Sequence, residues 1–78
     1  MKLTVKEAAR LMGASPAFVR RGLQQGSLPI GAAVVGETGK WSFWIDHARL
    51  ANYLRKDPEK LLRLVTIWRA EGEEEDAR

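Results

Sequence analysis

The stretch TVKEAARLMGASPAFVRRGLQQ, residues 4–25, predicts two short helices joined by a tight turn. Thr4 is a good N-cap, and Glu7 three residues later completes a capping box, in which each side chain accepts a hydrogen bond from a backbone N–H at the helix start. Apolar side chains then recur along one stripe of a helix; they are Val5, Ala8, Ala9 and Met12. Glu7 falls outside this stripe. Gly13 ends the helix, because glycine takes the left-handed conformation at little steric cost.

A second start signal follows at once and predicts a helix from Pro16 to Gln24 or Gln25. Ser15 is its N-cap, and proline at the first helical position loses nothing by lacking an N–H. Gly26 is expected to end the helix. Its apolar positions are Val19 and Leu23, with Phe18 at their edge. The side chains left for solvent or a ligand are Ala17, Arg20, Arg21, Gln24 and Gln25.

Two capped helices separated by about three residues match a helix-turn-helix, in which the second helix lies in the DNA major groove. Arginine binds guanine edges or phosphates, so at least one of Arg20 and Arg21 is expected to contact DNA; which of them reads a base stays open. Gln24 and Gln25 are either further contacts or plain solvent-facing residues. Ser15 is expected chiefly as a cap, although a helix N-terminus beside DNA commonly also binds a phosphate.

The composition indicates one small domain that folds without covalent or metal staples. The chain has 78 residues, no cysteine and one histidine, His47, which argues against a disulfide framework, a thiolate metal site or a His-rich metal site. No cofactor and no small-molecule substrate are expected, and no convergent titratable cluster points to an enzyme. No apolar run resembles a signal peptide or approaches a membrane span, so the cytoplasm is the expected location and no membrane contact is predicted.

The net charge of +3 conceals a division along the chain. Residues 71–78 hold five acidic residues and one arginine, which leaves 12 basic and 5 acidic residues in residues 1–70. The body therefore carries a net charge of +7, which suits a polyanionic partner, while the acidic end is expected to be a disordered tail.

Residues 30–45 predict a β-hairpin after Leu28 has returned to the core. A strand around Ala33 to Val35, the glycine-bearing turn at 36–39 and an alternating strand at 40–45 follow one another. The alternation puts Trp41, Phe43 and Ile45 on one face, and Trp41 with Phe43 is expected in the core. Trp44 lies on the other face, either covered by the C-terminal helix or exposed for a partner.

Two further helices are predicted from their caps. Asp46 caps a helix from His47 to Arg55 or Lys56, with Leu50, Tyr53 and Leu54 as its apolar contacts. Asp57 and Pro58 begin a fourth helix that runs to about Ala70 and is apolar over more than one face. This helix either folds back to enlarge the core or forms a protein–protein surface.

Three segments of the chain resemble the small winged-helix domains of the MerR and excisionase type. They are LTVKEAARLMGAS, SPAFVRRGLQQGSLP and GKWSFWIDHARLANYL, and the resemblance covers about residues 3–54. It implies an α+β, mainly helical fold: a winged helix-turn-helix with a two-stranded β-hairpin wing and an added C-terminal helix. The division expected is a DNA-binding domain at 1–56, the added helix at 57–70, packed on it or used for partner contact, and the acidic tail at 71–78.

The resemblance also implies where DNA is bound. The second helix enters the major groove and the hairpin lies over the backbone or minor groove. Arg20 and Arg21 occupy the paired basic positions of the family, Ala17 and Gln24 lie on the same surface, and Lys40 sits at the wing strand. The chain departs from the pattern in two ways. Glu37 in the wing turn weakens the case for deep contact of the tip, and the segment from residue 57 onward has no counterpart in minimal excisionases. The chain also lacks the long coiled coil and effector domain of full MerR regulators.

Two functions from different classes follow. The first is sequence-specific binding of double-stranded DNA by an excisionase-like architectural factor or a small transcriptional regulator of a phage or mobile element. Its partners would be a site-specific recombinase or further copies of itself on adjacent sites. The alternative is a protein-interaction adaptor that keeps the winged helix as scaffold and docks a partner on its Leu/Trp-rich C-terminal helix. The target DNA sequence and the oligomeric state stay open.

Overall fold

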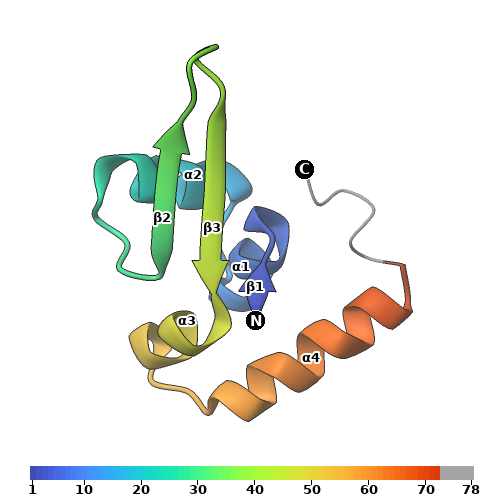
Figure 1. The fold of residues 1–78 in the computed structure, drawn as a ribbon. Coiled ribbons are helices and arrows are strands. Elements are labelled where there is room, and N and C mark those ends of the chain that lie inside the picture. The colour runs from blue at the N-terminus through green and yellow to red at the C-terminus, as the bar shows by residue number, and fades with distance from the viewer. Residues whose placement is uncertain (73–78) are drawn as a thin grey trace.

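The computed structural model describes residues 1–72 as a small α+β domain that is mostly helical (Figure 1). Its elements in chain order are β1 (Lys2–Leu3), α1 (Val5–Met12), α2 (Pro16–Gln25), β2 (Gly31–Val35), β3 (Trp41–Asp46), α3 (His47–Leu54) and α4 (Pro58–Ala70). The strands form one antiparallel sheet in the order β1-β3-β2. Of the predicted acidic tail, residues 73–78 lie outside the described residues.

The helix boundaries follow the predicted caps. Thr4 and Glu7 form the complete capping box at the start of α1. Ser15, Asp46 and Asp57 each accept a backbone N–H at the start of α2, α3 and α4. Two left-handed glycines at φ 70° and 73°, the ones predicted as stops, end α1 and α2. These ends depend on groups that are neighbours in the chain, which is why local sequence predicts them.

The predicted two-stranded hairpin is in fact part of a three-stranded sheet. Lys2 and Leu3 pair with Asp46 and Ile45, so β3 is the central strand and β1 closes its other edge. Leu3 is almost fully buried as a result. In Figure 1 the sheet lies in front of α1 and α2, so these helices cover one face and the other faces the viewer.

The core lies between the helices and the covered face of the sheet. Its fully buried large side chains are Leu3, Val19, Ile30, Ile45, Leu50 and Val65. Leu28 is buried, as predicted. Along β3 the alternation is as expected, but burial falls toward the tip: Phe43 is half-buried and Trp41 is 43% exposed. The prediction that Trp41 belongs to the core is therefore wrong, because the hairpin extends beyond the helices that would cover it.

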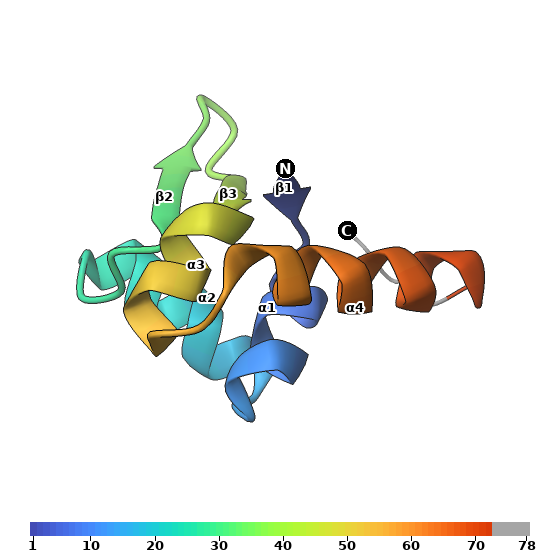
Figure 2. The ribbon, with the colours of Figure 1, turned by 90° about the horizontal axis from the view of Figure 1, so that it is seen from below.

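The fourth helix folds back on the domain. Leu61, Val65 and Trp68 are buried. Trp68, which the adaptor hypothesis expected to dock a partner, is therefore part of the core. Figure 2 shows α4 running past α3 and α1 along one side of the molecule. Tyr53 of α3, expected as an apolar contact, is instead 45% exposed. No helix of the described residues is both long and apolar enough to cross a membrane.

Candidate functional site

The exposed face of α2 holds most of the side chains predicted to bind a ligand. Val19, Gly22 and Leu23 are buried and fasten the helix to the body. Five of the predicted side chains are exposed on the remaining surface: Ala17, Arg20, Arg21, Gln24 and Gln25. The sequence of α2 contains no acidic residue, so this face carries positive charge only.

The helical spacing divides that face into rows. Ala17, Arg21 and Gln24 follow one another at i, i+4 and i+7, which places them on one row nearly opposite the buried residues of α2. Arg20 is one residue before Arg21 and therefore points about 100° to its side. The outermost row of the helix thus carries one arginine and one glutamine, and the second arginine flanks it.

Arg20 and Arg21 are available to a ligand. Within residues 1–72 neither guanidinium takes part in an ion pair or a hydrogen bond. Each has five N–H donors in a planar fork that matches phosphate or a guanine edge. Two such groups are thus exposed on a helix whose opposite side is packed in the core.

Ser15 is the predicted cap at the end of this face. Its Oγ accepts the backbone N–H of Phe18 at 3.1 Å, and the residue is exposed. Because a hydroxyl that accepts one hydrogen bond can still donate its own proton, the cap does not exhaust the hydrogen bonding of Ser15. Phe18 itself is 54% exposed and extends the face. Phe18 precedes Gln25 by seven residues, a spacing that places both on the same side of the helix and could have predicted its exposure. The sequence prediction placed Phe18 only at the edge of the apolar stripe.

Lys40 does not lie with the residues of α2. It is exposed, and its carbonyl accepts the N–H of Gly36 at 2.8 Å where the hairpin turns. Figure 1 shows this end of the hairpin extending beyond α2. The predicted site residues therefore form one group of six on and before α2 and one isolated lysine on the hairpin.

The hairpin also exposes apolar side chains, of which only Trp44 had been considered as a surface for a partner. Val35 pairs across the strands with Trp41, and both are about half exposed near the tip. Trp44 and Val34 lie on the opposite face of the sheet and are 50% and 63% exposed. Of the two alternatives for Trp44, the structure shows exposure: α4 does not cover it.

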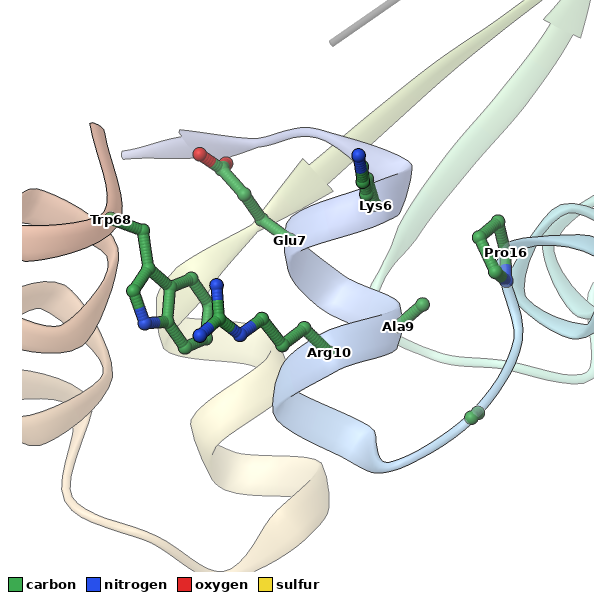
Figure 3. Close-up of a pocket in the computed structure, with 7 residues that line it drawn as sticks. Lys6, Glu7, Ala9, Arg10, Pro16 and Trp68 are labelled. Carbon is green, nitrogen blue, oxygen red and sulfur yellow. The ribbon is translucent and has the colours of Figure 1, made fainter. Parts of the chain in front are cut away.

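A pocket of about 220 Å³ lies between α1, the start of α2 and Trp68 of α4 (Figure 3). The guanidinium of Arg10 reaches across from α1 and stacks on the Trp68 ring, 4.0 Å from its centroid. Such a cation–π contact is favourable because the face of an aromatic ring is electron-rich. Lys6 adds a second positive charge at the rim of the pocket.

Glu7 is the buried acid of this region. Although it falls outside the predicted apolar stripe, its exposed fraction is only 4% because Arg69 of α4 covers it. Burial alone raises the pKa of a carboxyl group, but the hydrogen bonds from Arg69 and Thr4 and the positive charge of Arg69 outweigh it, so the pKa of Glu7 is lowered. The carboxylate therefore stays ionised, and the Arg69 guanidinium balances its charge.

Asp46 and His47 also serve the fold. The N-terminal ammonium lies 2.9 Å from His47 Nδ1 and 3.6 Å from Asp46 Oδ1. Asp46 Oδ2 accepts the N–H of Arg49 as the cap of α3. Burial raises the pKa of Asp46, but this hydrogen bond and the charge of the N-terminal ammonium lower it overall. In residues 1–72 no group of three or more acidic, histidine or cysteine side chains is placed to hold a metal ion.

Comparisons of the chain with protein-family models, with curated proteins and with solved structures gave no match.

Proposed function

We propose that the chain binds double-stranded DNA as a winged helix-turn-helix, with α2 in the major groove and the β2–β3 hairpin as the wing. The observation that carries the proposal is the pair Arg20 and Arg21, held without partners among the described residues on the acid-free face of α2. The short turn between α1 and α2, closed by a left-handed Gly13, supports it.

The dimensions of α2 suit the groove. Ten residues make a helix of about 15 Å, and the major groove of B-DNA is about 12 Å wide and admits one helix. The row of Ala17, Arg21 and Gln24 would face the base edges, since it lies nearly opposite the core. Arg20, which points to the side, would bind a phosphate. Arginine pairs with guanine and glutamine with adenine in a bidentate manner, so this row has the chemistry to read sequence.

The wing adds a second, weaker contact. Lys40 at the end of the hairpin would approach the DNA backbone, where one positive charge contributes to affinity but not to specificity. Glu37 in the same turn opposes close contact of the tip with phosphates. We therefore assign most of the binding free energy to α2.

The protein would act by binding and shaping DNA in the cytoplasm, without chemistry of its own. Two roles use these same contacts: an excisionase-like architectural factor that assists a site-specific recombinase, and a small transcriptional regulator. An adaptor function is the second candidate, and it is favoured by one observation, the exposure of Leu64 and Ile67 on α4.

The experiment is a fluorescence-anisotropy titration of labelled duplex DNA with the wild type, Arg20→Ala, Arg21→Ala and the control Arg49→Ala, an exposed arginine of α3. Each α2 variant is expected to bind about 5- to 150-fold more weakly, which corresponds to a loss of about 1 to 3 kcal/mol for one contact. Selection of bound sites from a random duplex library is expected to give a consensus that Arg21→Ala relaxes and Arg20→Ala keeps. Equal affinity of all four proteins would refute the assignment of the face.

A further inference from the structure

The outward face of α4 carries a row of side chains that does not contribute to the core. Lys60, Arg63, Leu64 and Ile67 line a shallow groove along this helix. Leu64 is 44% exposed and Ile67 50% exposed, whereas Leu61, Val65 and Trp68 on the inward face are buried. An exposed aliphatic pair at i, i+3 on a helix is the kind of stripe that helix–helix contacts use.

The charges on this row are ordered. Two basic residues, Lys60 and Arg63, stand at its N-terminal end, and Glu71 stands at its C-terminal end. Glu71 follows Ile67 by four residues, and its N–H donates to the Ile67 carbonyl at 3.1 Å, so it continues the same face. Among the described residues, Lys60, Arg63 and Glu71 have no side-chain partner.

Ile67 is the midpoint of this order. Arg63 precedes it by four residues and Glu71 follows it by four, which is about 6 Å along the helix on either side. If two α4 helices are laid antiparallel with their Ile67 side chains together, Arg63 of each lies opposite Glu71 of the other. The face is therefore complementary to itself under a two-fold axis, as an isologous interface requires.

We propose that this face of α4, the row Lys60–Arg63–Leu64–Ile67–Glu71, binds the same face of a second copy of the chain in an antiparallel pair. The order of the charges argues for a second copy as the partner. Arg63 and Glu71 lie at equal distances on either side of Ile67, and only a partner with the same order of charges requires that symmetry. Figures 1 and 2 show α4 at the outside of the molecule, where a second helix has access.

The size of the row sets the strength of the contact. Five residues from each copy are far fewer than the roughly 20–30 residues a side of a standard stable interface. The pair is thus expected to be weak in solution and to become significant at high local concentration. It does not depend on DNA binding, since α2 and α4 use different surfaces.

Charge reversal tests the pairing without DNA. Sedimentation velocity over increasing protein concentration is expected to show a monomer–dimer equilibrium for the wild type. Arg63→Glu and Glu71→Arg should each weaken dimerisation by about tenfold, because each places like charges opposite one another. The double variant Arg63→Glu/Glu71→Arg restores both pairs with reversed sign and should dimerise like the wild type.

Cross-linking tests the position of the axis. The chain has no cysteine, so Ile67→Cys introduces a single thiol, and oxidation should join two copies through it. Thr66→Cys is the matched control, since Thr66 is exposed but lies about 100° around the helix. A wild type that stays monomeric at every concentration would overturn the proposal, as would equal cross-linking of the two cysteine variants. Failure of the double charge variant to restore the dimer would overturn it too and assign self-association to another surface.

Discussion

Arg69 donates hydrogen bonds to both carboxylate oxygens of Glu7, at 2.8 and 2.9 Å, and so fastens the last turn of α4 to the first turn of α1. The same guanidinium donates to the Lys2 carbonyl at 3.0 Å, which brings β1 into the contact. Glu7 also accepts the N–H of Thr4 at 2.9 Å in the capping box. One buried carboxylate thus joins the start of α1 to a residue of α4 that lies 62 positions later in the chain.

Replacing Arg69 by alanine is expected to destabilise the protein by about 2 kcal/mol, because it removes charge-assisted hydrogen bonds and leaves the buried Glu7 carboxylate without its cation. Urea unfolding measures the change. Arg63→Ala on the same helix is the control; its guanidinium is exposed, and the substitution should change the free energy of unfolding by less than about 0.5 kcal/mol. Equal effects of the two substitutions would show that the Arg69–Glu7 pair contributes nothing particular.

The lowered pKa of Glu7 makes stability depend on pH. Its ordinary value is 4.5, and the folded protein holds it lower, so the unfolded chain binds the proton more readily. The stabilisation from Glu7 is therefore present above about pH 4.5 and is lost as the pH falls through the lower pKa of the folded state. Urea midpoints should fall with acidification in the wild type.

Glu7→Gln separates this contribution from that of Asp46, whose pKa is also lowered. The variant is expected to be less stable than the wild type at neutral pH, and the difference should shrink as the pH falls. A difference that stays constant down to about pH 3 would mean that Glu7 titrates alike in the folded and unfolded states.

Gly31 permits a close approach between β2 and β3. A Cβ atom at this position would lie 1.9 Å from the Trp44 carbonyl oxygen and 2.8 Å from the Ile45 Cα, so a backbone would have to move. Gly31→Ala is expected to cost about 2 kcal/mol or more in thermal or urea unfolding. At Gly36 the nearest atom to such a Cβ is 3.7 Å away, and Gly36→Ala should be tolerated. The prediction is checked by comparing the free energies of unfolding of the two variants, of which Gly31→Ala should be the less stable.

Removing α4 should destabilise the rest of the chain. A protein that ends at Lys56 loses the buried side chains of Leu61, Val65 and Trp68 and uncovers Glu7. Each large core side chain contributes about 2–5 kcal/mol, an amount comparable to the whole stability of a small domain. Circular dichroism should show a strongly lowered melting temperature or an unfolded chain. A truncated chain that melts like the full one would instead make residues 1–56 an independent domain.

The local sequence predicts those parts of the fold that depend on contacts between residues close together in the chain. The caps Thr4, Ser15, Asp46 and Asp57 each bond to a backbone N–H two or three residues away, and all four lie where expected. The strand β1 was missed because two residues are too short for a pattern and gain their partner only from residues 45 and 46. The burial of Glu7 was missed for the same reason, since the cation that makes it possible is supplied by α4.

The candidate site divides in the same way. The exposed face of α2 follows from helical spacing, so all five predicted side chains of that helix lie on it. Trp41 was assigned to the core by a correct alternation, but alternation does not say how far the helices extend beneath a hairpin. The exposed row on α4 could not be predicted from the sequence. The helix is apolar over more than one face, so the pattern does not reveal which of its leucines the fold covers.

The salt dependence of duplex binding tests the proposal that the face of α2 binds DNA through its arginines. The logarithm of the binding constant should fall linearly with the logarithm of salt concentration, with a slope of about −0.9 for each phosphate contact, and Arg20→Ala should make that slope shallower by about one. A wild type without affinity for duplex DNA even at low salt, or a slope that Arg20→Ala leaves unchanged, would show that these arginines do not bind DNA phosphates.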